Sequence, residues 1–86
     1  MPKISEFFGI AIYMYYREHQ PPHFHAIYGD EEALIGIDSL SVIKGKLSPR
    51  ATGLVMEWAS IYKEELLRDW AMAESQLPLG KIEPLR

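Results

Sequence analysis

The feature that most limits the fold is an abrupt change in apolar periodicity at Ser48-Pro49. Serine is a favoured N-cap, and proline fits the first position of a helix. Beyond them, apolar residues recur at steps of three and four, which is the spacing of a helix with one buried face. These residues are Ala51, Val55, Trp58, Tyr62, Leu66, Trp70 and Ala73. The pattern predicts helix from residue 49 to about Gln76, before the prolines of the C-terminal tail.

The length of this helical segment sets a second limit. About 28 residues at 1.5 Å each would span ~42 Å. A compact domain of this size has a radius of gyration of only ~12 Å. The segment must therefore break near Ser60 into two packed helices, or extend beyond its own domain to a partner. We favour the break.

The first half of the chain has the pattern of strands. Residues 10–16 (IAIYMYY) and 23–28 (HFHAIY) are rich in β-branched and aromatic types, and the prolines of REHQPP separate them. Gly29-Asp30 is typical of a tight turn. Shorter strands are expected at 33–37 and 40–44, and the opening residues 3–8 add a fifth candidate.

Together these segments predict an α+β fold: an antiparallel sheet of three to five strands packed against one long or two shorter C-terminal helices. The chain has 86 residues, enough for one domain. We place that domain at residues 1–76 and an extended C-terminal arm at 77–86. No stretch approaches the ~18 apolar residues of a membrane span, and the N-terminus does not resemble a signal peptide, so we expect a cytoplasmic protein.

Three histidines within seven residues are the strongest chemical signal, in the segment EHQPPHFH. On a strand, His23 and His25 share one face, and Phe24 and Ala26 point to the other. His19 comes from the preceding loop. Three interpretations fit. In the first, the histidines bind zinc, with Glu18 or Asp30 completing or orienting the site. In the second, His23 and His25 are a general acid and base, with Arg17 or Lys46 steadying an anion. In the third, the histidines are structural, with no cofactor.

A second candidate site is the turn KGKLSPR, residues 44–50. Helix N-termini attract anions, and Lys44, Lys46, Ser48 and Arg50 would strengthen such a site. The net charge of −3 argues against a generally nucleic-acid-binding surface. The absence of cysteine excludes thiolate chemistry and disulfides. An ordinary solvated turn and helix cap is the alternative.

Several segments together resemble a known bacterial family, the "domain of unknown function 4160" family. They are MPKISEFFGIAIYMYY, EHQPPHFHA, LSPR before the helix, and PLGKIEPL. Family members are often encoded beside another small protein, so the resemblance implies a component of a two-gene, toxin–antitoxin-like module. The order of strand, hairpin and helix also resembles that of small RNase toxins, which favours His-based RNA cleavage as one hypothesis. A metal-dependent enzyme and a non-catalytic structural interaction module are the alternatives.

The apolar pattern of the first strand bears on assembly. Ile10, Ile12 and Met14 lie on one face of it, and Tyr13 and Tyr15 on the other. One helical layer covers only one face of a sheet. The arm adds four spaced apolar residues, Leu77, Leu79, Ile82 and Leu85. We therefore expect a homo-oligomer, or a complex with a protein encoded by a neighbouring gene.

Overall fold

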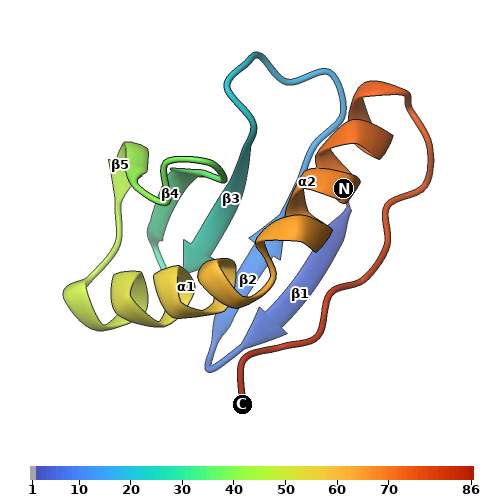
Figure 1. The fold of residues 1–86 in the computed structure, drawn as a ribbon. Helices are drawn as coiled ribbons and strands as arrows, with labels where there is room; N and C mark the ends of the chain where they lie inside the picture. Colours follow the sequence, from blue (N-terminus) through green and yellow to red (C-terminus); the bar gives the residue numbers. More distant parts are fainter. Residues whose placement is uncertain (1) are drawn as a thin grey trace.

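A computed structural model describes residues 2–86, which form an antiparallel sheet followed by two helices (Figure 1). The five strands lie side by side in chain order: β1 (Lys3–Phe7), β2 (Ile10–Tyr13), β3 (His23–Tyr28), β4 (Glu31–Gly36) and β5 (Val42–Lys46). The helices are α1 (Pro49–Ile61) and α2 (Lys63–Glu74). Neither described helix has the length and apolarity that crossing a bilayer requires. The predicted α+β class is confirmed, with the largest expected number of strands.

The helical segment breaks at Tyr62, close to the expected position. Tyr62 has φ −109° and ψ 26°, which are outside the helical range. It is both the C-cap residue of α1 and the N-cap residue of α2. Figure 1 shows α1 running across the sheet and α2 turning away from its direction. α2 ends at Glu74, two residues before the predicted end, because Gln76 adopts φ 58° and the amide of Leu77 donates to the carbonyl of Met72.

The helices cover one face of the sheet, and strand parity decides which side chains they bury. Ile10, Ile12 and Met14 are fully buried, whereas Tyr13 and Tyr15 on the opposite face are half-buried. Trp58 of α1 packs in this core, and its ring lies 5.6 Å from that of Phe24 and 5.2 Å from that of Phe7. On the other sheet face, the only ring of a helix that packs on β3 among the described residues is that of Trp70, against His23. The partner expected on that face stays a prediction.

The C-terminal arm lies along β1 of its own chain (Figure 1). The amide of Ile82 donates to the carbonyl of Ile4 at 2.8 Å, and the indole of Trp58 donates to the carbonyl of Glu83 at 2.8 Å. Ile82 and Leu85 are buried, whereas Leu77 is exposed. The arm thus occupies part of the outer edge of β1, and β5 is the edge strand on the other side of the sheet.

Asp69 of α2 ties down the start of the arm. Its Oδ1 accepts a hydrogen bond from the amide of Gly80 at 3.0 Å, and its Oδ2 is buried without a partner among the described residues. Burial raises the pKa of Asp69 above its ordinary value; the Gly80 amide and the charge of Arg68 lower it, and Glu65 raises it further. Because burial outweighs the hydrogen bond, the folded protein holds the Asp69 proton more tightly than the unfolded chain does.

We expect Asp69→Asn to be at least as stable as the parent protein at neutral pH. Asparagine keeps the oxygen that accepts from Gly80 and cannot ionise. The folded state holds the Asp69 proton more tightly than the unfolded chain, so protonation of Asp69 contributes to the free energy of unfolding. That contribution is complete below the ordinary aspartate pKa, about 3.9. That contribution is lost as the pH rises through the raised pKa of the folded state.

Urea unfolding of both proteins from acidic to neutral pH, in EDTA, measures the effect. The free-energy difference in favour of Asp69→Asn should grow as the pH rises. A difference independent of pH would show that Asp69 does not ionise at a cost to the fold.

Candidate functional site

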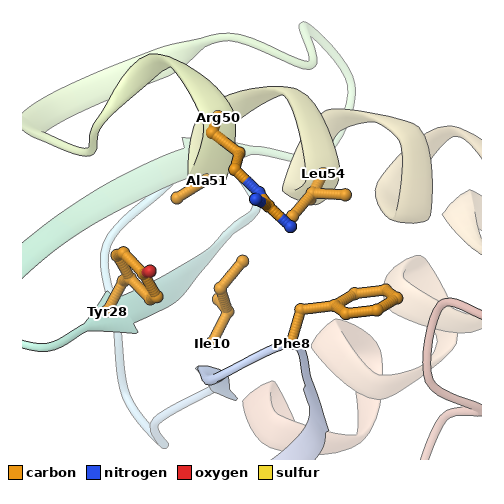
Figure 2. Close-up of a pocket in the computed structure, with 6 residues that line it drawn as sticks. All are labelled: Phe8, Ile10, Tyr28, Arg50, Ala51 and Leu54. Atoms are coloured by element: carbon orange, nitrogen blue, oxygen red, sulfur yellow. The ribbon is translucent and has the colours of Figure 1, made fainter.

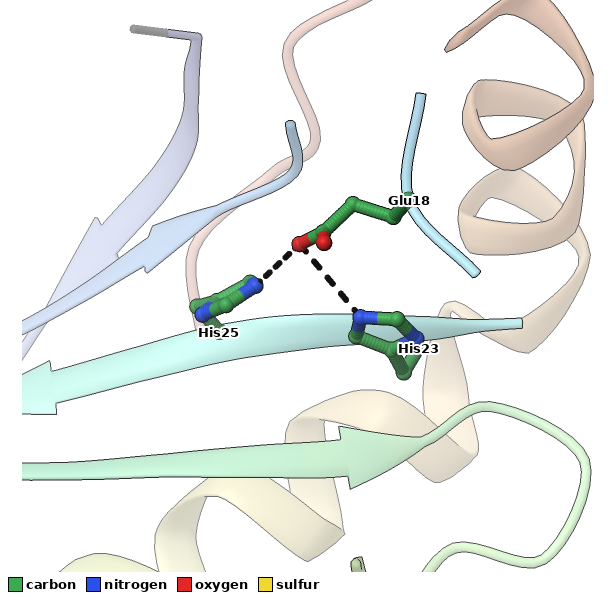
Figure 3. A group of neighbouring side chains, drawn as sticks. All are labelled: Glu18, His23 and His25. Carbon is green, nitrogen blue, oxygen red and sulfur yellow. Dashed lines mark hydrogen bonds and ion pairs between the residues drawn. The ribbon is translucent and has the colours of Figure 1, made fainter. Parts of the chain in front are cut away.

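The candidate site lies at the start of β3, beside the loop that joins β2 to β3. His23 and His25 project on the same side of β3, and Phe24 and Ala26 are fully buried on the other, as the two-residue period predicts. Glu18 reaches the two imidazoles from the loop (Figure 3). Its Oε1 lies 2.5 Å from Nε2 of His25 and 3.4 Å from Nε2 of His23. Ligand atoms of these three residues all lie within 4.8 Å of one another.

The second nitrogen of each imidazole already has an acceptor. Nδ1 of His23 lies 2.8 Å from the carbonyl oxygen of Pro21, and Nδ1 of His25 lies 3.0 Å from Oε2 of Glu32. A carbonyl or carboxylate oxygen can only accept, so both Nδ1 atoms carry the proton. In a neutral ring, Nε2 then presents a lone pair. Both Nε2 atoms face the Glu18 carboxylate, and the 2.5 Å contact of His25 is a hydrogen bond only if its Nε2 is also protonated. Either that second proton or a bound cation would satisfy the contact.

His23 gives the clearest sign of an unmet requirement. Its side chain is 7% exposed, and its Nε2 is buried with no hydrogen-bond partner among the described residues. Its ring packs 5.2 Å from that of Trp70 and 5.5 Å from that of His25. Leaving a buried polar atom unpaired costs about 1–3 kcal/mol. An ion bound to Nε2 would remove that cost.

The surrounding groups fix the charge and orientation of the site. Burial alone would raise the pKa of Glu18, but the hydrogen bond and charge of His25, with the charge of His23, outweigh it and lower the pKa. Glu18 is therefore ionised at neutral pH. Tyr15 meets the His25 ring edge-on at 4.5 Å, and burial followed by the charge of Glu32 raises the pKa of Tyr15. Tyr15 thus stays neutral beside the cluster.

A pocket of about 190 Å³ opens beside the cluster. Seven residues line it: Glu18, His19, Gln20, Pro21, His23, Leu34 and Ile43. Two of the three clustered residues, Glu18 and His23, belong to its wall. A small molecule in the pocket would thus lie next to any ion held by the cluster.

The remaining sequence candidates for this site lie apart from the cluster. His19 is exposed and lines the pocket, but it is not one of the residues whose ligand atoms converge. Arg17 has φ 63°, and its Nη2 donates to Oε1 of Gln76 at 3.3 Å. Asp30 lies in the β3–β4 turn, at the opposite end of β3 from His23.

The residues of the predicted anion site are divided between several places. Ser48 caps α1, since its Oγ accepts from the amide of Ala51, and its own amide donates to the carboxylate of Glu31 at 2.8 Å. Lys44 and Lys46 are exposed on β5, opposite Leu34 and Glu32 of β4. Arg50 lines a different pocket, which neither lysine lines. A carboxylate of the chain itself thus already lies at the start of α1.

Sequence reasoning did not identify Glu32 as part of the site. The turn at Gly29-Asp30 pairs Ile27 with Glu32 and His25 with Leu34. Glu32 is consequently the diagonal neighbour of His25 on one sheet face, within reach of a long side chain. Counting outward from the predicted turn could have found it. No comparable signal distinguishes Glu18 from His19, because a loop imposes no period on its side chains.

Comparison of the sequence with known proteins gives one match, to a family profile. No curated protein and no solved structure matches the sequence. The family profile described as "Domain of unknown function (DUF4160)" matches residues 9–71. The matched range contains β2 to β5, all of α1, most of α2, and the cluster of Glu18, His23 and His25. It covers well over half of the chain, and the chain belongs to the DUF4160 family.

Proposed function

We propose that this protein is a metal-dependent enzyme that binds one zinc ion, or a similar divalent transition-metal ion, through Glu18, His23 and His25. The observation that carries the proposal is the convergence of two imidazole Nε2 atoms on the Glu18 carboxylate, with both Nδ1 atoms already bound to acceptors. Imidazole nitrogen and carboxylate oxygen are common zinc ligands.

The distances agree with a tetrahedral ion after a small adjustment. Ligand atoms about 2.0–2.1 Å from zinc are separated by roughly 3.3 Å at tetrahedral angles. The Glu18–His23 separation of 3.4 Å already has this value. The Glu18–His25 separation of 2.5 Å must open by less than about 1 Å, and Glu18 comes from a loop. The ligand atoms of all three residues lie within 4.8 Å of one another, so the ion would draw the cluster together, with the Glu18 side chain moving at least.

The outer contacts also support the proposal. Zinc-binding histidines commonly donate their second N–H to a carboxylate or a backbone carbonyl, which fixes the tautomer and ring orientation. Glu32 does this for His25, and Pro21 for His23. Three protein ligands leave the fourth position of a tetrahedral ion open, as in catalytic zinc sites. The neighbouring pocket would give a substrate access to that position.

A calorimetric titration of untagged protein tests the proposal. The protein is first freed of metal with EDTA and then exchanged into buffer without chelator. We expect one zinc to bind per chain, with release of heat and a rise in melting temperature. No saturable binding, or equal binding after heat denaturation, would contradict the proposal.

The RNA-cleavage hypothesis is the second candidate, as the activity of one component of a two-gene module. The proximity of the His23 and His25 rings, 5.5 Å between centroids, favours it, because an acid and a base must act on neighbouring atoms. Zinc would occupy the same nitrogens, so the two candidates respond oppositely to metal. RNA cleavage that persists in EDTA and requires both histidines would support the second candidate.

A further inference from the structure

A second cavity lies at the other end of β3, between α1 and the β1–β2 turn (Figure 2). Its volume is about 150 Å³, and six residues line it: Phe8, Ile10, Tyr28, Arg50, Ala51 and Leu54. None of them lines the pocket beside the proposed metal centre. Ile10 and Ala51 are buried and form its apolar base. The Tyr28 ring contributes one side and is 40% exposed.

Among the described residues, Arg50 is the one charged side chain in the lining of this cavity. Figure 2 shows its side chain extending from α1 across the opening toward the β1–β2 turn. Within residues 2–86, its guanidinium has no ion pair or side-chain hydrogen bond. None of the described acidic side chains lines the cavity. A ligand that bears one negative charge would therefore meet a free arginine and no opposing carboxylate.

Phe8 is difficult to explain by the fold alone. It occupies the first position of a two-residue turn with φ 50°, and Gly9 follows with φ 79°. Turns of this kind favour Asn-Gly, because a bulky side chain with positive φ is strained. Phe8 is also 55% exposed, so burial of its ring contributes little stability to offset this strain. What its ring does contribute is one wall of the cavity.

Size and charge together define the ligand. The volume of about 150 Å³ is comparable to that of a protein cavity that holds a benzene ring. A single arginine matches a single carboxylate, whereas a polyanion would be repelled by a chain of net charge −3. We propose that this cavity binds a carboxylate attached to one ring-sized apolar group, either a free aromatic acid or the C-terminal residue of a peptide.

Amide NMR titration of the full chain with benzoate tests this site. We expect saturable shifts at residues 8–10, 28 and 50–54, and none at Glu18, His23 or His25. Arg50→Gln should weaken benzoate binding about tenfold, since a charge-assisted hydrogen bond is lost. The matched control, Arg68→Gln, removes an exposed arginine of α2 outside the cavity and should bind benzoate normally. Benzyl alcohol, which lacks the charge, should bind weakly and respond to neither change.

Phe8→Asn distinguishes a binding residue from a structural one. Asparagine tolerates positive φ, so the variant should melt a few degrees higher while it binds benzoate several-fold more weakly. The two ligand sources are separated by a short peptide ending in phenylalanine, with a free or an amidated C-terminus. Tighter binding of the free-acid peptide than of benzoate would identify a peptide, and the reverse a free acid. Shifts spread over the whole surface, or equal benzoate affinity in Arg50→Gln and Arg68→Gln, would overturn the proposal.

Discussion

Zinc affinity is expected to fall by roughly 100-fold or more when His23 is changed to glutamine, because the ion loses one of three protein ligands. The Nε2 of His23 is buried and has no hydrogen-bond partner in the described part of the chain, and its one ion-pair contact there is with Glu18 of the same site. Competition with a chromophoric chelator measures the affinity. Circular dichroism and thermal unfolding in EDTA verify that the variant is folded.

The chain provides a matched control four residues away. His19→Gln makes the same chemical change at an exposed histidine outside the converging cluster, and it should leave zinc affinity unchanged. Glu32→Gln should have an intermediate effect of about tenfold, because it removes a carboxylate that orients His25 rather than a ligand. If His19→Gln weakens zinc binding as much as His23→Gln, the ligand set proposed here is wrong.

The largest expected effect on stability comes from a single methyl group at Gly45. This residue of β5 has φ 83°, and a Cβ there would collide with the backbone carbonyl oxygen of Glu32 and lie 3.1 Å from Cα of Ala33. The β4–β5 register shifts between Leu34 and Ile35, close to this point. We expect Gly45→Ala to lower the free energy of unfolding by roughly 2–4 kcal/mol, from backbone strain and separation of the two strands.

Gly53→Ala is the corresponding control. Gly53 lies within α1, and a Cβ there would meet nothing within 4 Å. Alanine is the better helix former, so this change should stabilise the protein by about 0.5–1 kcal/mol. Urea unfolding of both variants measures the difference. Equal effects of the two substitutions would mean that β5 does not pair with β4 as described.

The sequence was most informative where side-chain direction follows a period. Alternation along residues 23–26 placed both histidines on one face and Phe24 and Ala26 in the core, as the structure confirms. The turn at Gly29-Asp30 and the cap at Ser48 were also predictable, because each depends on local backbone chemistry. The length of the helical segment was enough to predict a break near Ser60, and the break lies at Tyr62, two residues away.

Features that depend on long-range packing were not predictable in this way. Glu18 and His19 are adjacent in a loop, and only the folded structure shows which one faces the imidazoles. Arg50 was grouped with Lys44 and Lys46 by proximity in sequence, but the change from strand to helix places it beside Phe8 and Tyr28 instead. The sequence predicted an extended arm but not where it docks, because its contacts with β1 and α1 join residues 78 and 25 positions apart.

The proposed metal centre depends most directly on which imidazole nitrogens are protonated and which bind the ion. Long-range ¹H–¹⁵N correlation of the histidine side chains, with and without zinc, reports both. We predict that His23 and His25 carry their proton on Nδ1 in the zinc-bound protein, and that zinc shifts their Nε2 resonances and leaves those of His19 unchanged. Zinc that shifts no Nε2 resonance, or that binds through Nδ1 of either ring, would contradict the site formed by Glu18, His23 and His25.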